Sequence, residues 1–448
     1  MSVAPEPSSV RRALSAHAAI GLIAGALLYL VCLTGSLSVL RAELQRFEQR
    51  DAPEMTHIAP DAVQRGVEAV LASERGRKQA TTHLYVHLPV EDLPRATVTT
   101  DSQAVHLTPD GRIAGPEEVA WSDFLLRLHY ALTLPGLWGL ILVGALGAAI
   151  LMLALTGIVA HPRIFRDAFR LRARDTGGLA LADWHNRLSV WTLPFSVAIA
   201  LTGAVIGLGT LGAWAIATVF ENGKVEAVYG PIFGEEGEPD PRPAAMPNVA
   251  AVLTTMARHY PDVTVTYATV HDPLTAGQEI QVTGEHARRL IFGETYRFDG
   301  AGRFVGTAGL SHGKTGQQAA ASVYKLHFGS FGGLAVKLAY VALGTALTVI
   351  CATGVSIWLG KRRRRGHDKP RLFKAWDAVV WGVPAALALS LLTRFVIGNS
   401  APLAPVFWLA SGLAVAAATS PVAPRVFRRS LQRILILLIV AVVASSCA

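Results

Sequence analysis

Charged residues are scarce in this chain of 448 residues, and so are cysteine and methionine. Only 16% of the residues are charged, against about 25% in a typical soluble domain. Hydrophobic residues make up 51% of the chain, and the mean hydropathy is +0.38. This composition excludes a disordered chain and argues against an ordinary soluble enzyme. It indicates an integral membrane protein.

The three cysteines, Cys32, Cys351 and Cys447, lie among apolar or small residues and form no CxxC or CxxCH motif. We therefore expect no disulfide framework, no zinc site and no covalently attached c-type haem. No Gly-rich phosphate-binding motif marks a nicotinamide or flavin site, because the glycine-rich stretches lie within expected helices. The net charge of +9 is typical of the cytoplasmic loops of a membrane protein, so we expect no nucleic-acid partner.

Seven apolar segments are candidates to span a bilayer, which takes roughly 20 residues. They are 13–40, 137–160, 189–219, 335–359, 375–398, 403–420 and 431–446. The first is longer than the ~7–15 residues of a signal-peptide core, and no A-x-A site closes it, so we expect an uncleaved helix. The clusters of arginine and lysine beside these segments all fall on one side if the N-terminus is cytoplasmic.

This orientation predicts a membrane all-α helical bundle of about seven transmembrane helices with two small α+β modules outside. Each module combines a helical stretch, 61–74 or 249–260, with short alternating runs and an Asp-Gly turn. The expected segments are a cytoplasmic N-terminus at 1–12, helices at 13–40, 123–162, 184–219 and 323–360, outer modules at 41–122 and 220–322, cytoplasmic basic loops at 163–183 and 361–374, and three last helices within 375–448.

The first four apolar helices contain an internal repeat. Each has a Thr-Gly pair, and the four pairs are Thr34-Gly35, Thr156-Gly157, Thr202-Gly203 and Thr353-Gly354. Each also has a histidine upstream. His17 and His185 each lie 17 residues before their pair, whereas His129 and His327 lie 27 and 26 residues before theirs. Helices one and three therefore match each other, as do helices two and four, which indicates a duplicated unit.

The matched histidines form two pairs on opposite faces of the predicted four-helix core. His17 and His185 lie near the cytoplasmic ends of their helices, and His129 and His327 near the outer ends, roughly 20–35 Å away. A single interfacial histidine could simply be solvated, but four in two symmetric pairs favour a function. No Cys, Asp or Glu accompanies them, and zinc usually takes four ligands. The pairs instead suit the axial positions of two b-type haems.

His161 ends the second apolar segment on the same side as His17 and His185. It could replace one of them as an iron ligand, or hydrogen-bond a haem propionate. Gly21 and Gly25 follow His17 at i+4 and i+8. They could let a flat macrocycle approach the helix, or serve ordinary helix packing.

Three further residues have open interpretations. Lys337, at the outer edge of the fourth helix, could snorkel to the headgroups or pair with a propionate. His83 and His87 lie four residues apart in a strand-like run, so they could share one face of a strand. A surface or substrate-contact role is the most that the sequence supports for this pair.

Several motifs are similar to those of a known family. They are His17 to Gly35, ending in Leu-Thr-Gly; Leu128-His129 with Gly136 and Gly139; 156–167; 183–195; and Leu326-His327-Phe328-Gly329 with Thr353-Gly354. Over about residues 10–366 the chain resembles the PepSY-associated transmembrane family of bacterial inner-membrane proteins. That family includes iron-regulated membrane proteins and di-haem ferric-siderophore reductases. The resemblance implies that the outer modules are PepSY-like and that the four repeat histidines are the family's helix histidines. The segment beyond 366 departs from the family's four-helix form.

The resemblance implies an oxidoreductase of the inner membrane with two b-type haems. It would pass electrons from a cytoplasmic or quinol donor to a periplasmic acceptor, with a ferric siderophore as the expected acceptor and Fe(II) as the product. Two alternatives stay open. One is a non-enzymatic sensor or binding scaffold, which predicts no haem absorbance. The other is a permease for iron chelates, which predicts uptake by vesicles without a reductant.

Overall fold

The computed structural model describes residues 7–76, 81–161, 163–167, 179–233, 237–286, 289–291, 293–307 and 313–446. Cys447 and part of the predicted loop 163–183 lie outside these residues. The chain divides into two compact units. The helix unit comprises Met1–Arg41, Val119–Leu208 and Gly332–Ala448, and the sheet unit comprises Ala42–Glu118 and Gly209–Phe331.

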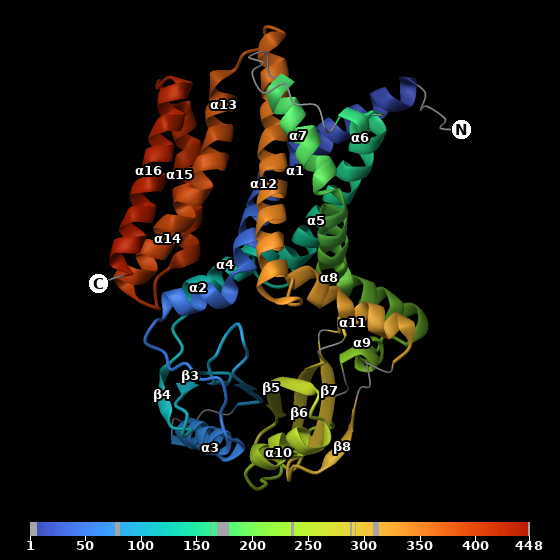
Figure 1. Cartoon of the computed structure of the whole chain (residues 1–448), viewed down its shortest axis with the longest axis vertical. Helices are drawn as coiled ribbons and strands as arrows, with labels where there is room; N and C mark the ends of the chain where they lie inside the picture. The colour runs from blue at the N-terminus through green and yellow to red at the C-terminus, as the bar shows by residue number, and fades with distance from the viewer. Residues whose placement is uncertain are drawn as a thin grey trace. The chain divides into compact units, whose positions relative to one another are not determined.

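Apolar helices build the helix unit (Figure 1). They are α1 (Pro7–Ser38), α4 (Ala120–Ala131), α5 (Trp138–Ala160), α6 (Ile164–Asp167), α7 (Leu179–Trp191), the first part of α8 (Leu193–Phe220), α12 (Gly333–Arg364), α13 (Pro370–Asp377), α14 (Val383–Ile397), α15 (Leu403–Ala416) and α16 (Pro424–Ser445). Among the described residues, five segments are long and apolar enough to cross a membrane: Ser8–Ser38, Trp138–Ala160, Leu193–Phe220, Gly333–Arg364 and Pro370–Ile397. The chain is a multi-pass membrane protein, and the count of seven spans stays a prediction.

Three of the predicted helices are each divided into two in the structure: 123–162, 184–219 and 323–360. Between α4 and α5, Leu132 has a φ of 51°, which ends the first helix in a left-handed turn. Helix α11 (Thr315–Phe328) ends in the same way at Gly329, with a φ of 67°. The short first halves, and not the long apolar helices, carry the histidines at positions 129, 185 and 327.

Small residues bring the long helices of the helix unit close together. A Cβ atom added at Gly144 on α5 would lie 2.8 Å from the backbone carbonyl carbon of Gly207 on α8. A Cβ atom at Gly25 on α1 would lie 2.8 Å from Cγ2 of Val355 on α12. Such close approaches are the usual role of glycine between membrane helices. Gly25 therefore serves helix packing, and it also lines the cavity beside His17.

The sheet unit joins eight strands with helices from both outer segments of the chain. The strands are β1 (His83–His87), β2 (Thr97–Thr99), β3 (Ala104–Leu107), β4 (Ile113–Pro116), β5 (Val263–His271), β6 (Glu279–His286), β7 (Glu294–Asp299) and β8 (Phe304–Thr307). The helices are α2 (Arg41–Glu48), α3 (Pro60–Gly76), α9 (Glu226–Phe233), α10 (Val249–His259) and α11. Helices α3 and α10 confirm the helical stretches predicted at 61–74 and 249–260.

The predicted pair of separate modules is instead one continuous sheet. The strand order is β4-β3-β2-β1-β5-β6-β7-β8, and all neighbours are antiparallel. The two halves meet where β1 pairs with β5, with His83 opposite His271 and His87 opposite Tyr267. In separate four-stranded halves, β1 and β5 would each be an unpaired edge strand. Pairing them with each other satisfies the backbone groups of both strands.

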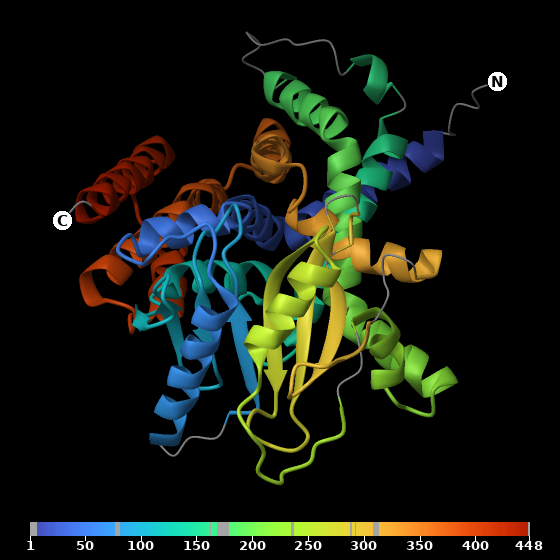
Figure 2. The same cartoon turned by 60° about the horizontal axis from the view of Figure 1, so that its bottom comes forward.

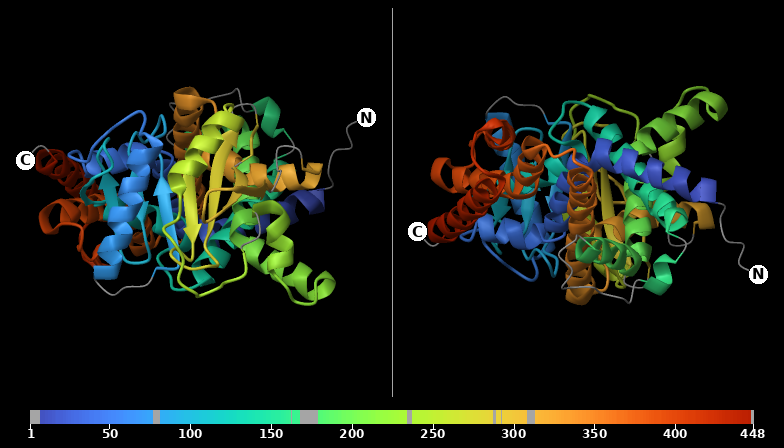
Figure 3. Two further views of the ribbon diagram at one scale, coloured as in Figure 1. Left: turned by 90° about the horizontal axis from the view of Figure 1, so that it is seen from below. Right: turned by 90° about the horizontal axis from the view of Figure 1, so that it is seen from above.

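Helices α3 and α10 cover one face of this sheet (Figures 2 and 3). The core beneath them includes Val67 of α3, Met256 of α10, and Leu84, Val270 and Phe298 of the strands, all at most 1% exposed. Burying one such side chain stabilises the fold by about 1.5–3 kcal/mol. Because residues of both halves belong to the same cluster, the two halves share one hydrophobic core.

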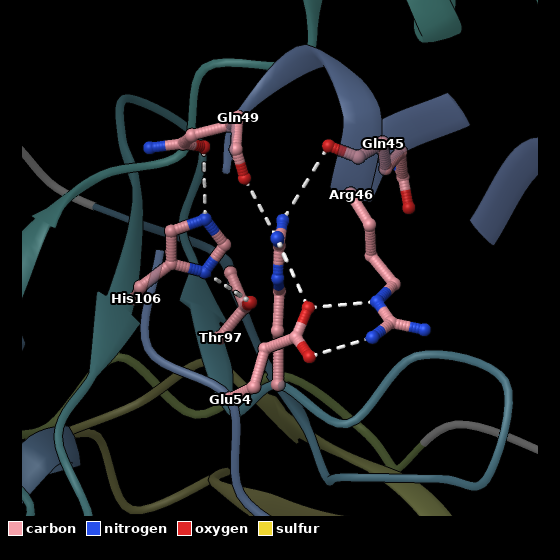
Figure 4. A network of polar contacts seen from close by, with 7 residues as sticks. Gln45, Arg46, Gln49, Glu54, Thr97 and His106 are labelled. Carbon is pink, nitrogen blue, oxygen red and sulfur yellow. Dashed lines mark hydrogen bonds and ion pairs between the residues drawn. The ribbon is translucent and has the colours of Figure 1, made fainter. Parts of the chain in front are cut away.

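A polar network ties the segment around α2 to the sheet (Figure 4). Arg95 is buried and donates to the backbone oxygen of Gln49 at 2.7 Å. Its guanidinium also lies 3.4 Å from the Glu54 carboxylate. Glu54 accepts two hydrogen bonds of 2.7 Å from Arg46, and these hold the pKa of the Glu54 carboxyl below its ordinary value. The network gives the two terminal nitrogens of the buried guanidinium hydrogen-bond partners, which lowers the cost of burying this charge.

Candidate functional site

Two of the predicted histidines lie close together in the helix unit. The rings of His17 on α1 and His185 on α7 have centroids 6.5 Å apart, and their planes make an angle of 86°. With metal–nitrogen bonds of about 2.0–2.1 Å, two imidazoles on opposite sides of one metal have centroids roughly 6 Å apart. The separation of the two rings would therefore allow His17 and His185 to hold one metal ion between them.

The hydrogen bonds of His17 fix which ring nitrogen carries the proton. Its Nδ1 lies 3.0 Å from the backbone oxygen of Leu153 and 3.2 Å from Oγ1 of Thr156. A carbonyl oxygen can only accept, so Nδ1 is protonated and donates. In the neutral ring, Nε2 then keeps its lone pair. Histidines that ligate metals typically donate their other N–H in this way.

His185 is held in the same tautomer by a different group. Its Nδ1 lies 3.0 Å from Oγ1 of Thr353 on α12. The Thr353 hydroxyl donates to the backbone oxygen of Val349 at 2.8 Å. The hydroxyl oxygen therefore accepts from Nδ1–H of His185, and Nε2 again keeps its lone pair.

The glycine of each Thr-Gly pair makes room for an imidazole ring. A Cβ atom at Gly157 would lie 3.3 Å from Cε1 of His17, and one at Gly354 would lie 3.3 Å from Cε1 of His185. Each pair therefore contacts a histidine from another helix, with threonine beside Nδ1 and glycine beside Cε1. The sequence marked these pairs only as a repeat, and the spacing along the chain gave no sign of this contact.

A cavity of about 360 Å³ lies beside the two rings. Its walls come from α1, α5, α7 and α12 and are mostly apolar, with His17, His161, His185 and Lys361 among the lining residues. Its volume is within the range of pockets that enclose small ligands, roughly 300–1,000 Å³. Two imidazoles with free Nε2 lone pairs beside an apolar cavity fit a flat apolar macrocycle that carries a metal.

His161 lies at the C-terminal end of α5, where its backbone N–H donates to the oxygen of Gly157 at 3.1 Å. The structure thus brings His161 to the cavity of His17 and His185, as predicted for its side of the bundle. Its two predicted roles, iron ligand or propionate partner, both stay open. Gly21 also lines this cavity.

His129 makes a related contact, in which a backbone oxygen takes the place of the threonine hydroxyl. Its Nδ1 lies 3.0 Å from the backbone oxygen of Val31, and a Cβ atom at Gly35 would lie 2.6 Å from its Cε1. His129 belongs to the helix unit and His327, on α11, to the sheet unit. The outer pair of His129 and His327 therefore stays a prediction.

Within the described residues, no group of three or more His, Cys, Asp or Glu side chains is placed to hold a bare metal ion. The other predicted residues have clear positions. Lys337 on α12 is buried, at 7% exposure. His83 and His87 lie on β1, where alternate residues share a face of the sheet as predicted.

A family model and a curated relative each match a large part of this chain. The family described as "PepSY-associated TM region" matches residues 14–361. The chain belongs to this PepSY-associated transmembrane family. The matched region contains all five candidate histidines and ends before α13. An uncharacterized protein of Pseudomonas aeruginosa is 29% identical over 335 residues, which cover 65% of this chain and 79% of that protein.

Proposed function

We propose that this PepSY-associated membrane protein transfers electrons across the inner membrane to a periplasmic acceptor, with two b-type haems as cofactors. The observation that carries the proposal is the inner pair, His17 and His185. Both rings have Nδ1 engaged as a donor, and the apolar cavity lies beside them. When bound, haem would supply a one-electron Fe(III)/Fe(II) couple.

The residues of the chain have distinct roles in this proposal. His17 and His185 would hold the inner iron through Nε2, while the Leu153 carbonyl and the Thr353 hydroxyl accept from Nδ1–H and keep the rings oriented. The apolar walls exclude water and lower the local dielectric, which tunes the reduction potential. Lys361 lines the cavity, and its positive charge would pair with a haem propionate. His129 and His327 would form the outer pair.

The proposed direction of transfer follows from the topology predicted by the sequence. With a cytoplasmic N-terminus, His17 and His185 face a cytoplasmic or quinol donor, and the outer pair faces a periplasmic acceptor. A ferric siderophore is the proposed acceptor. Reduction to Fe(II) helps release because Fe(II) is less charge-dense than Fe(III), so oxygen-donor chelators hold it less tightly.

Haem quantification in purified full-length protein tests this proposal. We expect two haems per chain, both extracted by acid-acetone, because the chain has no CxxCH motif to attach them covalently. His17→Ala and His185→Ala should each lose one haem. His259→Ala, at an exposed position of α10, is the matched control and should keep both. A ratio near zero in protein made with ample haem contradicts the proposal and favours the scaffold alternative.

Reduction of a ferric chelate by vesicles that contain the protein tests the direction. His327→Ala should abolish reduction of a chelate added on the outer side, while a cytoplasmic reductant still reduces the remaining haem. His17→Ala should leave an outer haem that this reductant cannot reduce. If His327→Ala keeps both haems and full reductase activity, both the outer pair and the direction are wrong.

A further inference from the structure

One face of the sheet is polar and rich in histidine and tyrosine. On β1, His83, Tyr85 and His87 alternate with the buried Leu84 and Val86. Helices α3 and α10 cover the face that carries Leu84 and Val86. The histidines therefore lie on the opposite face of the sheet.

Strand β5 places matching residues beside them on the same face. The register sets His83 opposite His271, Tyr85 opposite Thr269 and His87 opposite Tyr267. Residues directly opposite each other on antiparallel strands have side chains within contact distance. The polar face is thus built from both halves of the chain, and neither half alone contains it.

A cavity of about 180 Å³ lies on this polar face. Its lining is dominated by polar and aromatic side chains, including His83, Tyr85, Tyr267, His271, Gln281 and Thr283. This lining differs from the mostly apolar walls of the cavity beside His17. The composition favours a polar or ionic ligand over a flat apolar one.

The two histidines of this cavity have the spacing of shared metal ligands. The ring centroids of His83 and His271 are 5.2 Å apart, with an angle of 79° between the planes. Two imidazoles bound to one tetrahedral ion by bonds of about 2.0–2.1 Å have centroids roughly 5 Å apart. One ion between the rings would therefore need little movement of either strand.

A hydrogen-bonded chain fixes the tautomer of His83. The Thr82 hydroxyl donates to Oδ2 of Asp101 at 3.0 Å, so its oxygen accepts from Nδ1 of His83, also at 3.0 Å. The backbone N–H of Thr82 donates to the same carboxylate and lowers the pKa of Asp101. His83 therefore presents the lone pair of Nε2. A carboxylate behind a ligating histidine is a common arrangement in metal sites.

Other groups beside the pair orient it without competing for the ion. The ring of Tyr85 stacks on His83, with centroids 6.1 Å apart and planes 10° from parallel. Glu279, which pairs with His271 across β5 and β6, is engaged by Arg297 in two hydrogen bonds of 2.6 and 2.7 Å. Among the described residues, the imidazoles of His83 and His271 are thus the protein ligands, and water would complete the coordination.

We infer that His83 and His271 form a binding site for a divalent first-row transition-metal ion on the polar face of the sheet. Imidazole nitrogen suits Zn²⁺, Cu²⁺, Ni²⁺ and iron. Two protein ligands leave positions open, so the ion can enter and leave. The inference goes beyond the proposed function and does not rest on it, because all its residues belong to the sheet unit.

Calorimetric titration of the full-length, untagged protein in detergent with Zn²⁺ tests the site. We expect one saturable site per chain, at least tenfold weaker in His83→Ala and in His271→Ala. His87→Ala is the matched control, on the same strand and face, and should bind within twofold of the unchanged protein. Thr82→Val removes only the orienting hydroxyl and should weaken binding about 10-fold or more without changing stoichiometry.

Chemical protection tests the site without any substitution. Zn²⁺ should protect His83 and His271, but not His87, from diethylpyrocarbonate, as measured by mass spectrometry. His17→Ala should keep its Zn²⁺ affinity, so failure of the haem proposal and failure of this site are distinguishable. Unchanged affinity in folded His83→Ala and His271→Ala proteins, or equal modification of both histidines with and without Zn²⁺, would overturn the inference.

Discussion

At the scale of single residues, the Thr-Gly pairs explain how the histidines are held. In three described pairs, the glycine lies against the imidazole of a histidine from another helix. Gly35 contacts His129, Gly157 contacts His17 and Gly354 contacts His185. The contact combines an oxygen that accepts from Nδ1 with a glycine that leaves room at Cε1. Each ring therefore has one orientation and one tautomer before any metal binds, which is the condition for a preorganised ligand.

Thr353→Val tests this contact at His185. It removes the oxygen that accepts from Nδ1–H, and loss of such a partner costs about 10–100-fold in metal affinity. In a competition with apomyoglobin, we expect the Thr353→Val protein to retain haem at least tenfold less tightly than the unchanged protein. Thr348→Val is the matched control, because Thr348 is buried on the same helix and donates to the oxygen of Gly344 at 3.0 Å. Equal loss from both variants contradicts a specific role for Thr353.

His106 should make the stability of the sheet unit depend on pH. Its Nδ1 lies 3.1 Å from Oγ1 of Thr97, and its Nε2 lies 3.1 Å from Oε1 of Gln49 (Figure 4). Burial, with the nearby positive charge of Arg95, lowers the pKa of His106 from 6.5 to about 4, against a weaker opposing effect of Asp51. The unfolded chain therefore binds a proton between these pH values that the folded chain does not.

Stability of the sheet unit should consequently fall as the pH drops from about 6.5 to 4, by on the order of 2–3 kcal/mol. The measurement is pulse proteolysis of the full chain in urea at pH values from 7 to about 4.5. His106→Gln should lower the stability at pH 7 and flatten the profile in this window. Glu54, whose pKa is also lowered, contributes only at the acid end. A profile that keeps its slope in His106→Gln rules out His106 as the cause.

At the scale of elements, the crossing of α1 and α12 is tight. Cys32 on α1 and Cys351 on α12 have sulfur atoms 3.9 Å apart, and Gly25 lets Val355 approach α1. A disulfide needs an S–S distance of about 2.05 Å, so a small shift would allow one to form. The two thiols therefore report on the spacing of these helices.

Oxidation with copper phenanthroline in a Cys447→Ala background should join Cys32 to Cys351, as detected by mass spectrometry of peptides. Gly25→Leu should reduce the yield several-fold, because the new side chain would push α12 away from α1. Gly360→Ala is the control on α12, since its added Cβ would make only an ordinary contact, 3.7 Å from Arg364. Absence of the crosslink in the Cys447→Ala protein argues against the close crossing.

At the scale of the whole molecule, one sheet unites two distant stretches of chain. Leu84 of β1 is fully buried in the core that also contains Ile280 of β6. Leu84→Ala should cost about 2–5 kcal/mol. Because the core is shared, hydrogen exchange should quicken in β6 as well as in β2. Val305→Ala, at a position 59% exposed on β8, should change little. Faster exchange confined to β2 and β3 would indicate two independent modules.

The sequence predicted most elements because their signals are local. Apolar length marks α1, α5, α8 and α12, and alternation marks β1 and β6. The divided helices were missed because their breaks depend on single residues such as Leu132, whose left-handed backbone no composition rule predicts. The sequence wrongly predicted two separate outer modules. Strand alternation shows which face of a strand is buried, but not which other strand pairs with it.

The sequence by itself determined the membrane class, the family motifs and the five candidate histidines, because each depends on composition or on fixed spacing along the chain. Only the tertiary structure decided that His17 and His185 meet and that an oxygen from another helix, the Leu153 carbonyl for His17 and the Thr353 hydroxyl for His185, sets the tautomer of each. It also decided that His83 lies opposite His271. These are contacts between residues more than a hundred positions apart, and they arise from helix crossing and strand register, which local sequence does not encode.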